Sequence, residues 1–257
     1  MILGIDIGNT AIKFALLKGK RVMKERTIFH LESKKEVRVK IKRALNSFKS
    51  PGTKIKDIII CSVVPKHLKL VESQAKQLYK SKPRVIERDI YVPLKNKYKN
   101  PKHVGADRLV GAYAAKCLYK EPLIIVDFGT AITFDVINKR GEYEGGIIVP
   151  GIRLSAESLF KKTALLPKIS TFHVPRSVIG KSTQESILSG LFYGYGALCD
   201  GLIDNIKASI GGNPQLILTG GHTLKMKRFL KSHNLLIDKH LVLKGLYLLT
   251  VSDDKGS

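Results

Sequence analysis

The sequence predicts an α/β protein built from two similar mixed-sheet domains, and three observations support this. First, the opening stretch MILGIDIGNTAIKFALL recurs as LIIVDFGTAITFDVI at residues 123–137, with Asp6 over Asp127 and, after a one-residue gap, Thr10 over Thr130. Second, each copy is followed by a further strand and then by alternating helical and strand periodicities. Third, 257 residues are enough for two modest domains. We therefore expect domains at residues 1–119 and 120–257, with the ligand in a cleft between the copies.

The first half reads as a strand meander followed by helix and strand in turn. The expected strands are residues 2–5, 11–17, 21–28, 56–64 and 84–86, and the expected helices are residues 34–48, 66–79 and 106–119. The segment at residues 92–103 contains two prolines and reads as a loop.

The second half repeats this order. The expected strands are residues 123–127, 131–137, 145–149 and 214–218, and the expected helices are residues 153–161, 182–209, 224–232 and 244–251. Ser182 and Glu185 have the spacing of a capping box at the start of the long helix. That helix also contains four glycines, at 190, 194, 196 and 201, which lower helix stability. We expect another backbone to pack closely there, within the chain or across a subunit interface.

Composition favours a cytoplasmic protein. The three cysteines (Cys61, Cys117 and Cys199) are widely spaced in apolar surroundings, so we expect buried free thiols rather than disulfides or a metal site. Asp6 interrupts the first apolar run, unlike in a signal peptide. No stretch of uncharged apolar sequence is expected to be long enough to span a membrane.

The formal net charge of +24 is the compositional outlier. It allows a nucleic-acid partner, an acidic membrane surface, polyphosphate-bearing ligands or simply a lysine-rich solvated surface. Lysine and arginine are widely spread, with local concentrations at residues 34–43 and 95–102, but no base-reading helix and no aromatic residues interleaved with basic ones stand out. The solvated surface is favoured, nucleic acid is not expected, and no membrane partner is expected.

The repeated Asp-x-Gly turn is the chief candidate for chemistry. One such turn would be explained by hairpin geometry alone, because Asp, Asn and Gly are common turn residues. A turn does not require the same Asp, Gly and Thr twice. An Asp at a strand end can hold a hydrated cation, Gly lets phosphate approach the backbone, and a Thr hydroxyl can donate to it. The repetition therefore favours a nucleotide-phosphate site.

Two other patterns are set aside. Gly180-Lys181-Ser182 resembles the end of a Walker A loop, but Pro175 stands where that motif needs a glycine. The seven histidines form no pair at a metal-ligand spacing, so a zinc site is not expected. His222, after two glycines, could lie near a nucleotide base, although an ordinary loop histidine is favoured.

The duplicated hairpin resembles the phosphate loops of the actin, Hsp70 and sugar-kinase superfamily of ribonuclease H-like ATPase folds. Within it, DIGNT at residues 6–10, GADR at 105–108 and DFGTAIT at 127–133 resemble type III pantothenate kinases. GGIIVPGI at residues 145–152, STQES at 182–186 and TGG at 219–221 also match. The resemblance covers nearly the whole chain in order. It implies ATP-dependent phosphorylation of pantothenate to 4′-phosphopantothenate, the first step of coenzyme A biosynthesis, by a homodimer.

The resemblance also implies roles for individual residues. ATP contacts are implied at Asp6, Ile7, Gly8, Asn9, Thr10, Ala11, Ile12, Lys13 and Thr130. Pantothenate contacts are implied at Tyr98, Gly105, Ala106, Asp107, Arg108 and Thr183. Asp107 would be the proton acceptor. Asp6 would face Mg²⁺ through water, and Asp127 would hold a monovalent cation, K⁺ or NH₄⁺.

Residue chemistry agrees with these roles independently. Phosphoryl transfer to an alcohol needs positioning, charge neutralisation and a carboxylate that accepts the hydroxyl proton. Asp107 would lie in the first turn of its helix, where we expect the helix dipole to keep it ionised. Arg108 offers a fork that suits a carboxylate. The same two residues could equally be an ordinary helix cap and a surface cation.

Two alternatives remain. Another small-molecule kinase or phosphatase of the superfamily would share the two loops but would have no need of GADR. A non-catalytic, nucleic-acid-associated regulator would have no need of Asp6, Asp107 and Asp127, all of which are present.

Overall fold

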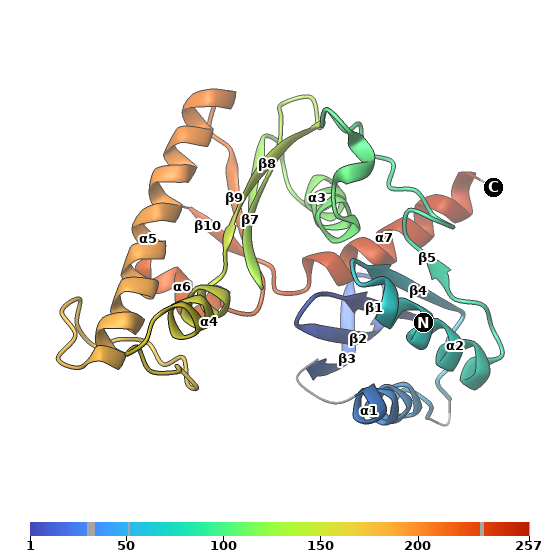
Figure 1. Cartoon of the computed structure of the whole chain (residues 1–257). Coiled ribbons are helices and arrows are strands. Elements are labelled where there is room, and N and C mark those ends of the chain that lie inside the picture. The colour runs from blue at the N-terminus through green and yellow to red at the C-terminus, as the bar shows by residue number, and fades with distance from the viewer. Residues whose placement is uncertain (30–33, 51, 232–233, 257) are drawn as a thin grey trace. The chain divides into compact units, whose positions relative to one another are not determined.

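The computed structural model describes residues 1–29, 34–50, 52–231 and 234–256. The chain forms two compact units, one made of residues 1–118 with 240–257 and the other of residues 119–239 (Figure 1). The sequence-based division at residues 119 and 120 assigned the C-terminal helix to the second domain, whereas the structure groups it with the first unit.

The first unit is a five-stranded mixed sheet with helices. Its strands are β1 (Ile2–Ile7), β2 (Ala11–Lys18), β3 (Arg21–Phe29), β4 (Asp57–Ser62) and β5 (Arg84–Val85). Its helices are α1 (Lys34–Asn46), α2 (Pro65–Tyr79), the 3₁₀ turn η1 (Pro101–His103), α3 (Ala106–Leu118) and α7 (Leu241–Gly256). The strand order is β3-β2-β1-β4-β5. The first three strands form an antiparallel meander, and β4 and β5 add parallel to it.

The second unit repeats that design. Its strands are β6 (Leu123–Phe128), β7 (Ala131–Ile137), β8 (Tyr143–Pro150), β9 (Gln215–Thr219) and β10 (Leu235–Ile237). Its helices are α4 (Ile152–Lys162), α5 (Thr183–Ile210), α6 (Thr223–Met226) and the 3₁₀ turn η2 (Lys227–Phe229). The order β10-β9-β6-β7-β8 is the first sheet's order read from the other edge. The two halves are therefore two copies of one mixed α/β unit, as the repeated hairpin predicts.

Buried side chains hold helices on both faces of the first sheet. On one face, Ile5, Phe14 and Ile60 are fully buried with Ile41 of α1 and Val71 of α2. On the other face, a second cluster combines strand and helix residues from α3 and α7: Ala15, Leu17, Ile59, Cys61, Val110, Leu246 and Leu249. Both faces are covered, which explains why β1 and β4 read as continuous apolar runs.

The long helix α5 is the central helix of the second unit's core. Leu188, Phe192, Cys199 and Ile203 are fully buried against the strands of the sheet. Ser182 caps the helix by accepting from the Glu185 N–H at 3.3 Å, as the capping-box prediction requires. Within the described residues α5 alone is long and apolar enough to cross a membrane, by length and composition only. A core helix with a broad apolar face satisfies the same test, and α5 packs on the sheet as such a helix.

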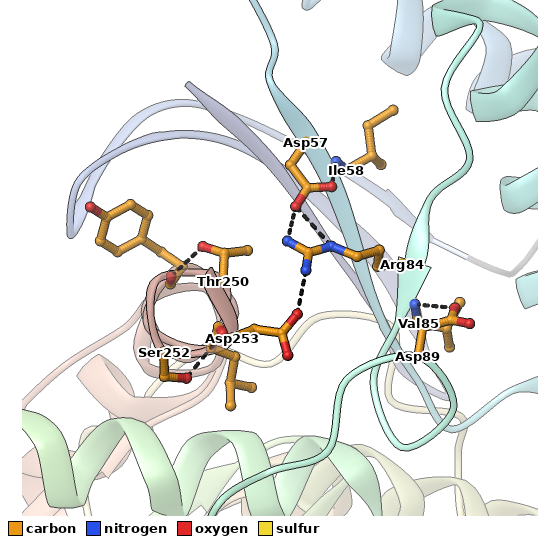
Figure 2. A network of polar contacts seen from close by, with 10 residues as sticks. Asp57, Ile58, Arg84, Val85, Asp89, Thr250, Ser252 and Asp253 are labelled. Carbon is orange, nitrogen blue, oxygen red and sulfur yellow. Dashed lines mark hydrogen bonds and ion pairs between the residues drawn. The ribbon is translucent and has the colours of Figure 1, made fainter. Parts of the chain in front are cut away.

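An ion-pair network ties α7 to the first sheet (Figure 2). Arg84 at β5 pairs with Asp57 at the start of β4, and its Nη1 also lies 2.6 Å from Oδ2 of Asp253 on α7. Close backbone packing adds to this contact, since a Cβ on Gly245 of α7 would lie 2.5 Å from the Val110 carbonyl oxygen of α3. These long-range contacts place the C-terminal helix in the first unit.

Three local expectations differ from the structure. The helix expected at residues 224–232 is only the short α6 followed by η2, and residue 232 lies outside the described residues. The Phe229 ring at the end of η2 packs against Phe192 of α5, with 5.3 Å between ring centroids. The strand β10 was not expected, since three residues give too little periodicity to recognise. Cys117 is exposed, whereas Cys61 and Cys199 are buried free thiols as expected.

Candidate active site

The first copied hairpin joins β1 to β2 at one edge of the first sheet. The Gly8 N–H donates to the Ala11 carbonyl oxygen at 3.0 Å, which closes the turn around Asn9 and Thr10. In the antiparallel register Asp6 lies opposite Lys13. Asn9 is exposed, while Asp6 and Lys13 are half-buried. The turn therefore presents a carboxylate and an ammonium group side by side, next to backbone that has little side-chain cover.

Asp107 lies in the first turn of α3 and interacts electrostatically with this hairpin. Its Oδ1 accepts from the Arg108 N–H at 2.8 Å, which fixes the carboxylate over the start of the helix. Gly105 is required just before it, because a Cβ there would lie 2.6 Å from the same Oδ1. The GADR motif thus holds one carboxylate in one orientation.

Burial dominates the electrostatics of both carboxylates. It raises the pKa of Asp6 to about 6, with nearby Lys13 lowering it and Asp107 raising it. Burial also raises the pKa of Asp107, against the lowering effect of the Arg108 N–H and its guanidinium. The first helical turn was expected to favour the ionised carboxylate, and burial opposes that effect.

Cys61 belongs to the same cluster and was not predicted. The parallel pairing of β1 with β4 places it opposite Asp6, and its side chain is fully buried. Burial raises the pKa of the Cys61 thiol, and the carboxylates of Asp6, Asp107 and Glu87 raise it further. The thiol stays neutral and acts as apolar packing behind Asp6. Only the strand order, which is a tertiary property, could have identified this neighbour.

The second copied hairpin is built in the same way. The Gly129 N–H donates to the Ala131 carbonyl oxygen at 3.1 Å, and Asp127 lies opposite Thr133 rather than a lysine. Thr130 is exposed at the tip of the turn. The second loop therefore lacks the internal cation of the first, so its carboxylate has a different electrostatic setting.

Two glycines of the second unit lie in close contact with the second copied hairpin. A Cβ on Gly220, which has a φ of +95°, would collide with the Asp127 carboxylate and the Phe128 backbone. A Cβ on Gly151 would lie 2.7 Å from the Gly129 carbonyl oxygen, and the Gly151 N–H donates to the Thr130 carbonyl oxygen at 3.0 Å. The matches GGIIVPGI and TGG contain these residues, but the sequence did not reveal their role, which is to let three chain segments meet around Asp127.

The remaining predicted residues divide between the two units. Tyr98 in the first unit is half-buried in a loop ordered by Asn96, whose Oδ1 accepts from the Tyr98 N–H at 2.9 Å. Thr183 in the second unit is the exposed first residue of α5. His222 is half-buried beside Phe172, 6.5 Å between ring centroids. Burial, with Lys225 and Arg153 adding to it, lowers the pKa of His222.

The hairpin carboxylates suit cations whose remaining coordination positions are filled by a bound ligand. In the part of the chain that the structure describes, no group of three or more His, Cys, Asp or Glu could enclose a metal. Mg²⁺ in phosphoryl-transfer sites does not need such a cage, because it keeps waters and binds one or two carboxylates together with substrate phosphates. Asp6, whose charge is opposed by burial, is a carboxylate of this kind. The site therefore fits a nucleotide-borne magnesium ion and not a protein-enclosed one.

Comparison with known proteins identifies the family. The family model described as type III pantothenate kinase matches residues 2–205. A type III pantothenate kinase from Persephonella marina is 43% identical over 249 residues, covering 96% of this chain and 97% of the relative. Another from a Sulfurihydrogenibium species is 38% identical over 252 residues, covering 97% and 99%. These matches span both hairpins and the GADR motif.

Solved structures agree on the fold. A Campylobacter jejuni protein named for the Baf family of transcriptional activators aligns with a TM-score of 0.61 at 21% identity, covering 99% of this chain and 100% of the other. Component A of (R)-2-hydroxyglutaryl-CoA dehydratase from Acidaminococcus fermentans aligns with a TM-score of 0.57 at 13% identity, covering 100% and 99%. Identities this low bear on architecture only, and they confirm the expected actin-like and sugar-kinase ATPase fold. The family model and the full-length relatives establish that this chain belongs to the type III pantothenate kinase family.

Proposed function

We propose that this chain transfers the γ-phosphoryl group of ATP to the hydroxyl of pantothenate, giving 4′-phosphopantothenate, the first step of coenzyme A biosynthesis. Family membership supports this activity. The observation that carries the residue assignment is that the Asp107 carboxylate raises the pKa of Asp6, although the two residues lie on different elements of the first unit. A cation-binding carboxylate and a proton-accepting carboxylate are the pair that such a transfer needs.

Asp107 is the proposed proton acceptor. A general base works best when its pKa is near the operating pH, and burial raises the pKa of Asp107 from its ordinary value in that direction. Its hydrogen bond from the Arg108 N–H fixes the position of one carboxylate oxygen. The pantothenate hydroxyl would donate its proton to Asp107 as the oxygen attacks the γ-phosphorus in line.

The first hairpin is the proposed phosphate loop. Residues 6–13 would contact ATP through the exposed turn amides and the Lys13 ammonium group, and Thr130 of the second unit would add its hydroxyl. Mg²⁺, held through water by Asp6, would neutralise charge on the phosphates. Asp127 would hold a monovalent cation, K⁺ or NH₄⁺, in the setting formed by Gly129 and Gly220.

The proposed pantothenate contacts are the residues of GADR with two outlying side chains. Arg108 would pair with the pantothenate carboxylate, since a guanidinium fork matches that group. Gly105 and Ala106 would present backbone, and Tyr98 and Thr183 would add hydroxyl groups.

A coupled assay of ADP release tests this function. With ATP, Mg²⁺, K⁺ and pantothenate present, we expect turnover that depends on pantothenate. Asp107→Asn should lower kcat by about 10²–10⁴-fold, because it removes a positioned base. Asp204→Asn, a change of the same kind at an exposed position of α5, is the matched control. Absence of pantothenate-dependent turnover, or an unimpaired Asp107→Asn enzyme, would reject the proposal.

We also infer that the protein is a cytoplasmic homodimer that uses α5 in its interface. Gly190, Gly194 and Gly201 lie on one exposed side of α5, and a Cβ at each would meet nothing within 4 Å in the described chain. Gly196 differs, since Phe229 of the same unit fills the space beside it. Glycines that lower helix stability without an internal contact are explained if a second copy packs against them.

A further inference from the structure

The positive charge of the chain is concentrated in one segment. Residues 18–56 contain 14 lysines and arginines against three glutamates, a formal net charge of +11 out of the +24 of the whole chain. This segment runs from the end of β2 through β3 and α1 to the start of β4. A lysine-rich surface whose only role is solvation would not need nearly half of its excess charge in 39 residues.

A groove between β3 and α1 lies within this segment. It has a volume of about 300 Å³ and carries cations on both walls, Arg26 from the strand and Lys40 and Arg43 from the helix. The remaining lining residues are Thr27, Ile28, Phe29, Ala44 and Ser47. Ile28 and Ala44 are buried and the three cations are exposed, so the charges border an apolar base.

Local geometry explains why these side chains converge. Lys40, Arg43 and Ser47 are three and four residues apart and therefore share one face of α1. β3 is the edge strand of its sheet, so no further strand covers its outer side. The Lys24 ammonium group donates to the Ser47 carbonyl oxygen and lies 5.7 Å from the centre of the Phe48 ring. It adds a fourth cation at the Ser47 end of the groove.

The carboxylate of Glu25 on β3 is engaged outside the groove, where it lies 3.4 Å from His240 Nδ1. Glu36, in the first turn of α1, does not line the groove. Among the described residues that line the groove, none carries a negative charge. An anion in the groove would therefore meet attraction from both walls.

We propose that this surface binds the phosphate backbone of single-stranded nucleic acid without sequence preference. The charge extends well beyond the groove, which favours an extended polyanion over one small anion. Cations on two facing walls suit a strand better than a flat membrane surface. Phe29 lines the groove with 55% of its surface exposed, so it can stack with a base. The proposal is independent of the kinase activity.

The test is fluorescence anisotropy with a labelled mixed-sequence DNA strand of about 20 nucleotides, between about 50 and 200 mM salt. The wild-type protein should bind with a linear dependence of log affinity on log salt concentration. The combined variant Arg26→Gln, Lys40→Gln, Arg43→Gln should lose at least about tenfold in affinity at the lowest salt. Its salt slope should fall by about 2, because each phosphate contact to a single strand contributes about 0.7.

Matched variants separate the groove from general charge. Lys66→Gln, Lys69→Gln and Lys76→Gln together remove the same charge from exposed positions of α2 in the same unit, and they should leave the slope unchanged. Lys13→Gln should also leave it unchanged, which excludes the phosphate hairpin as the binding site. If the triple groove variant folds poorly, Arg43→Gln alone should still lower the slope by about 0.7.

Several results would overturn the proposal. They are absence of binding at about 50 mM salt, an equal loss in the groove and α2 variants, or a groove that binds inorganic tripolyphosphate or phosphatidylglycerol vesicles but not the oligonucleotide. Pantothenate-dependent turnover of the groove and α2 variants is expected to be unchanged, whereas Lys13→Gln serves only as a control for oligonucleotide binding. That readout keeps a failure of this proposal distinct from a failure of the kinase assignment.

Discussion

Asp6 combines its proposed role at the phosphate loop with a cost to stability. Its carboxylate is half-buried at the end of β1, and burial together with Asp107 raises its pKa to about 6 despite the opposing effect of Lys13. A group whose pKa is raised on folding favours the folded state while it is protonated. Its contribution is therefore complete below pH 3.8 and is lost as the pH rises through about 6. Without a nucleotide-borne cation, the folded protein carries this penalty at neutral pH.

Asp6→Asn should therefore stabilise the nucleotide-free protein at pH 8 while abolishing turnover. The gain in unfolding free energy should reach at most about 3 kcal/mol, at about 1.4 kcal/mol per pKa unit, and should disappear near pH 4. Thermal unfolding at several pH values measures it, with Asp204→Asn as an exposed control. A variant that is less stable than wild type at pH 8, or a difference that does not vary with pH, would contradict this account.

At the level of elements, the contact between α3 and α7 is the clearest determinant of where the chain end packs. Gly245 brings the helices together so closely that a Cβ would lie 2.6 Å from Val110 Cγ1 and 3.2 Å from Ala114 Cβ. Arg84 reinforces the contact through its ion pair with Asp253 (Figure 2). Gly111, on the facing helix, has much more room, since its Cβ would meet Val242 Cγ2 at 3.8 Å.

Gly245→Ala should consequently destabilise the protein by about 1–3 kcal/mol through overpacking. Gly111→Ala adds the same methyl group to the same helix pair at an ordinary contact distance, and higher helix propensity should make it neutral or stabilising by up to about 1 kcal/mol. Thermal unfolding of the two variants measures these changes in stability. Equal effects would mean that close approach at Gly245 does not hold α7.

The exposed glycines of α5 give a second prediction at this scale. Gly194→Arg has space in the described chain, so the subunit should fold, but the new side chain should prevent a close helix contact between two copies. Light scattering should show a dimer for wild type and a monomer for the variant. Gln77→Arg on α2 controls for the added charge. A variant that remains dimeric would place the interface elsewhere or remove it.

For the whole molecule, the net charge of +24 implies self-repulsion that salt should relieve. Raising ionic strength from about 0.01 to 0.15 M shortens the Debye length from about 30 to about 8 Å. Tm should therefore increase over this range with choline chloride. A decrease would mean that attractive ion pairs such as those of Arg84 outweigh the repulsion.

The same measurement of Tm against salt concentration separates charge screening from the binding of a specific cation. KCl should raise Tm further than choline chloride at equal ionic strength, because a bound ion stabilises only the folded state. Asp127→Asn should remove that difference and leave the choline response intact. A potassium effect that survives the substitution would contradict the assignment of Asp127.

The sequence by itself determined the duplicated strand-turn-strand units, most helices and the residues presented at each turn. Those features depend on local periodicity and on side chains close together in the chain, such as Asp6 and Gly8. Only the tertiary structure placed Cys61 opposite Asp6, grouped α7 with the first unit and buried Asp107 so that the pKa of its carboxyl group is raised. Each of these depends on which distant segments pack together. Periodicity shows that a face is apolar, but it does not specify the partner that covers it or the dielectric surroundings that the partner creates.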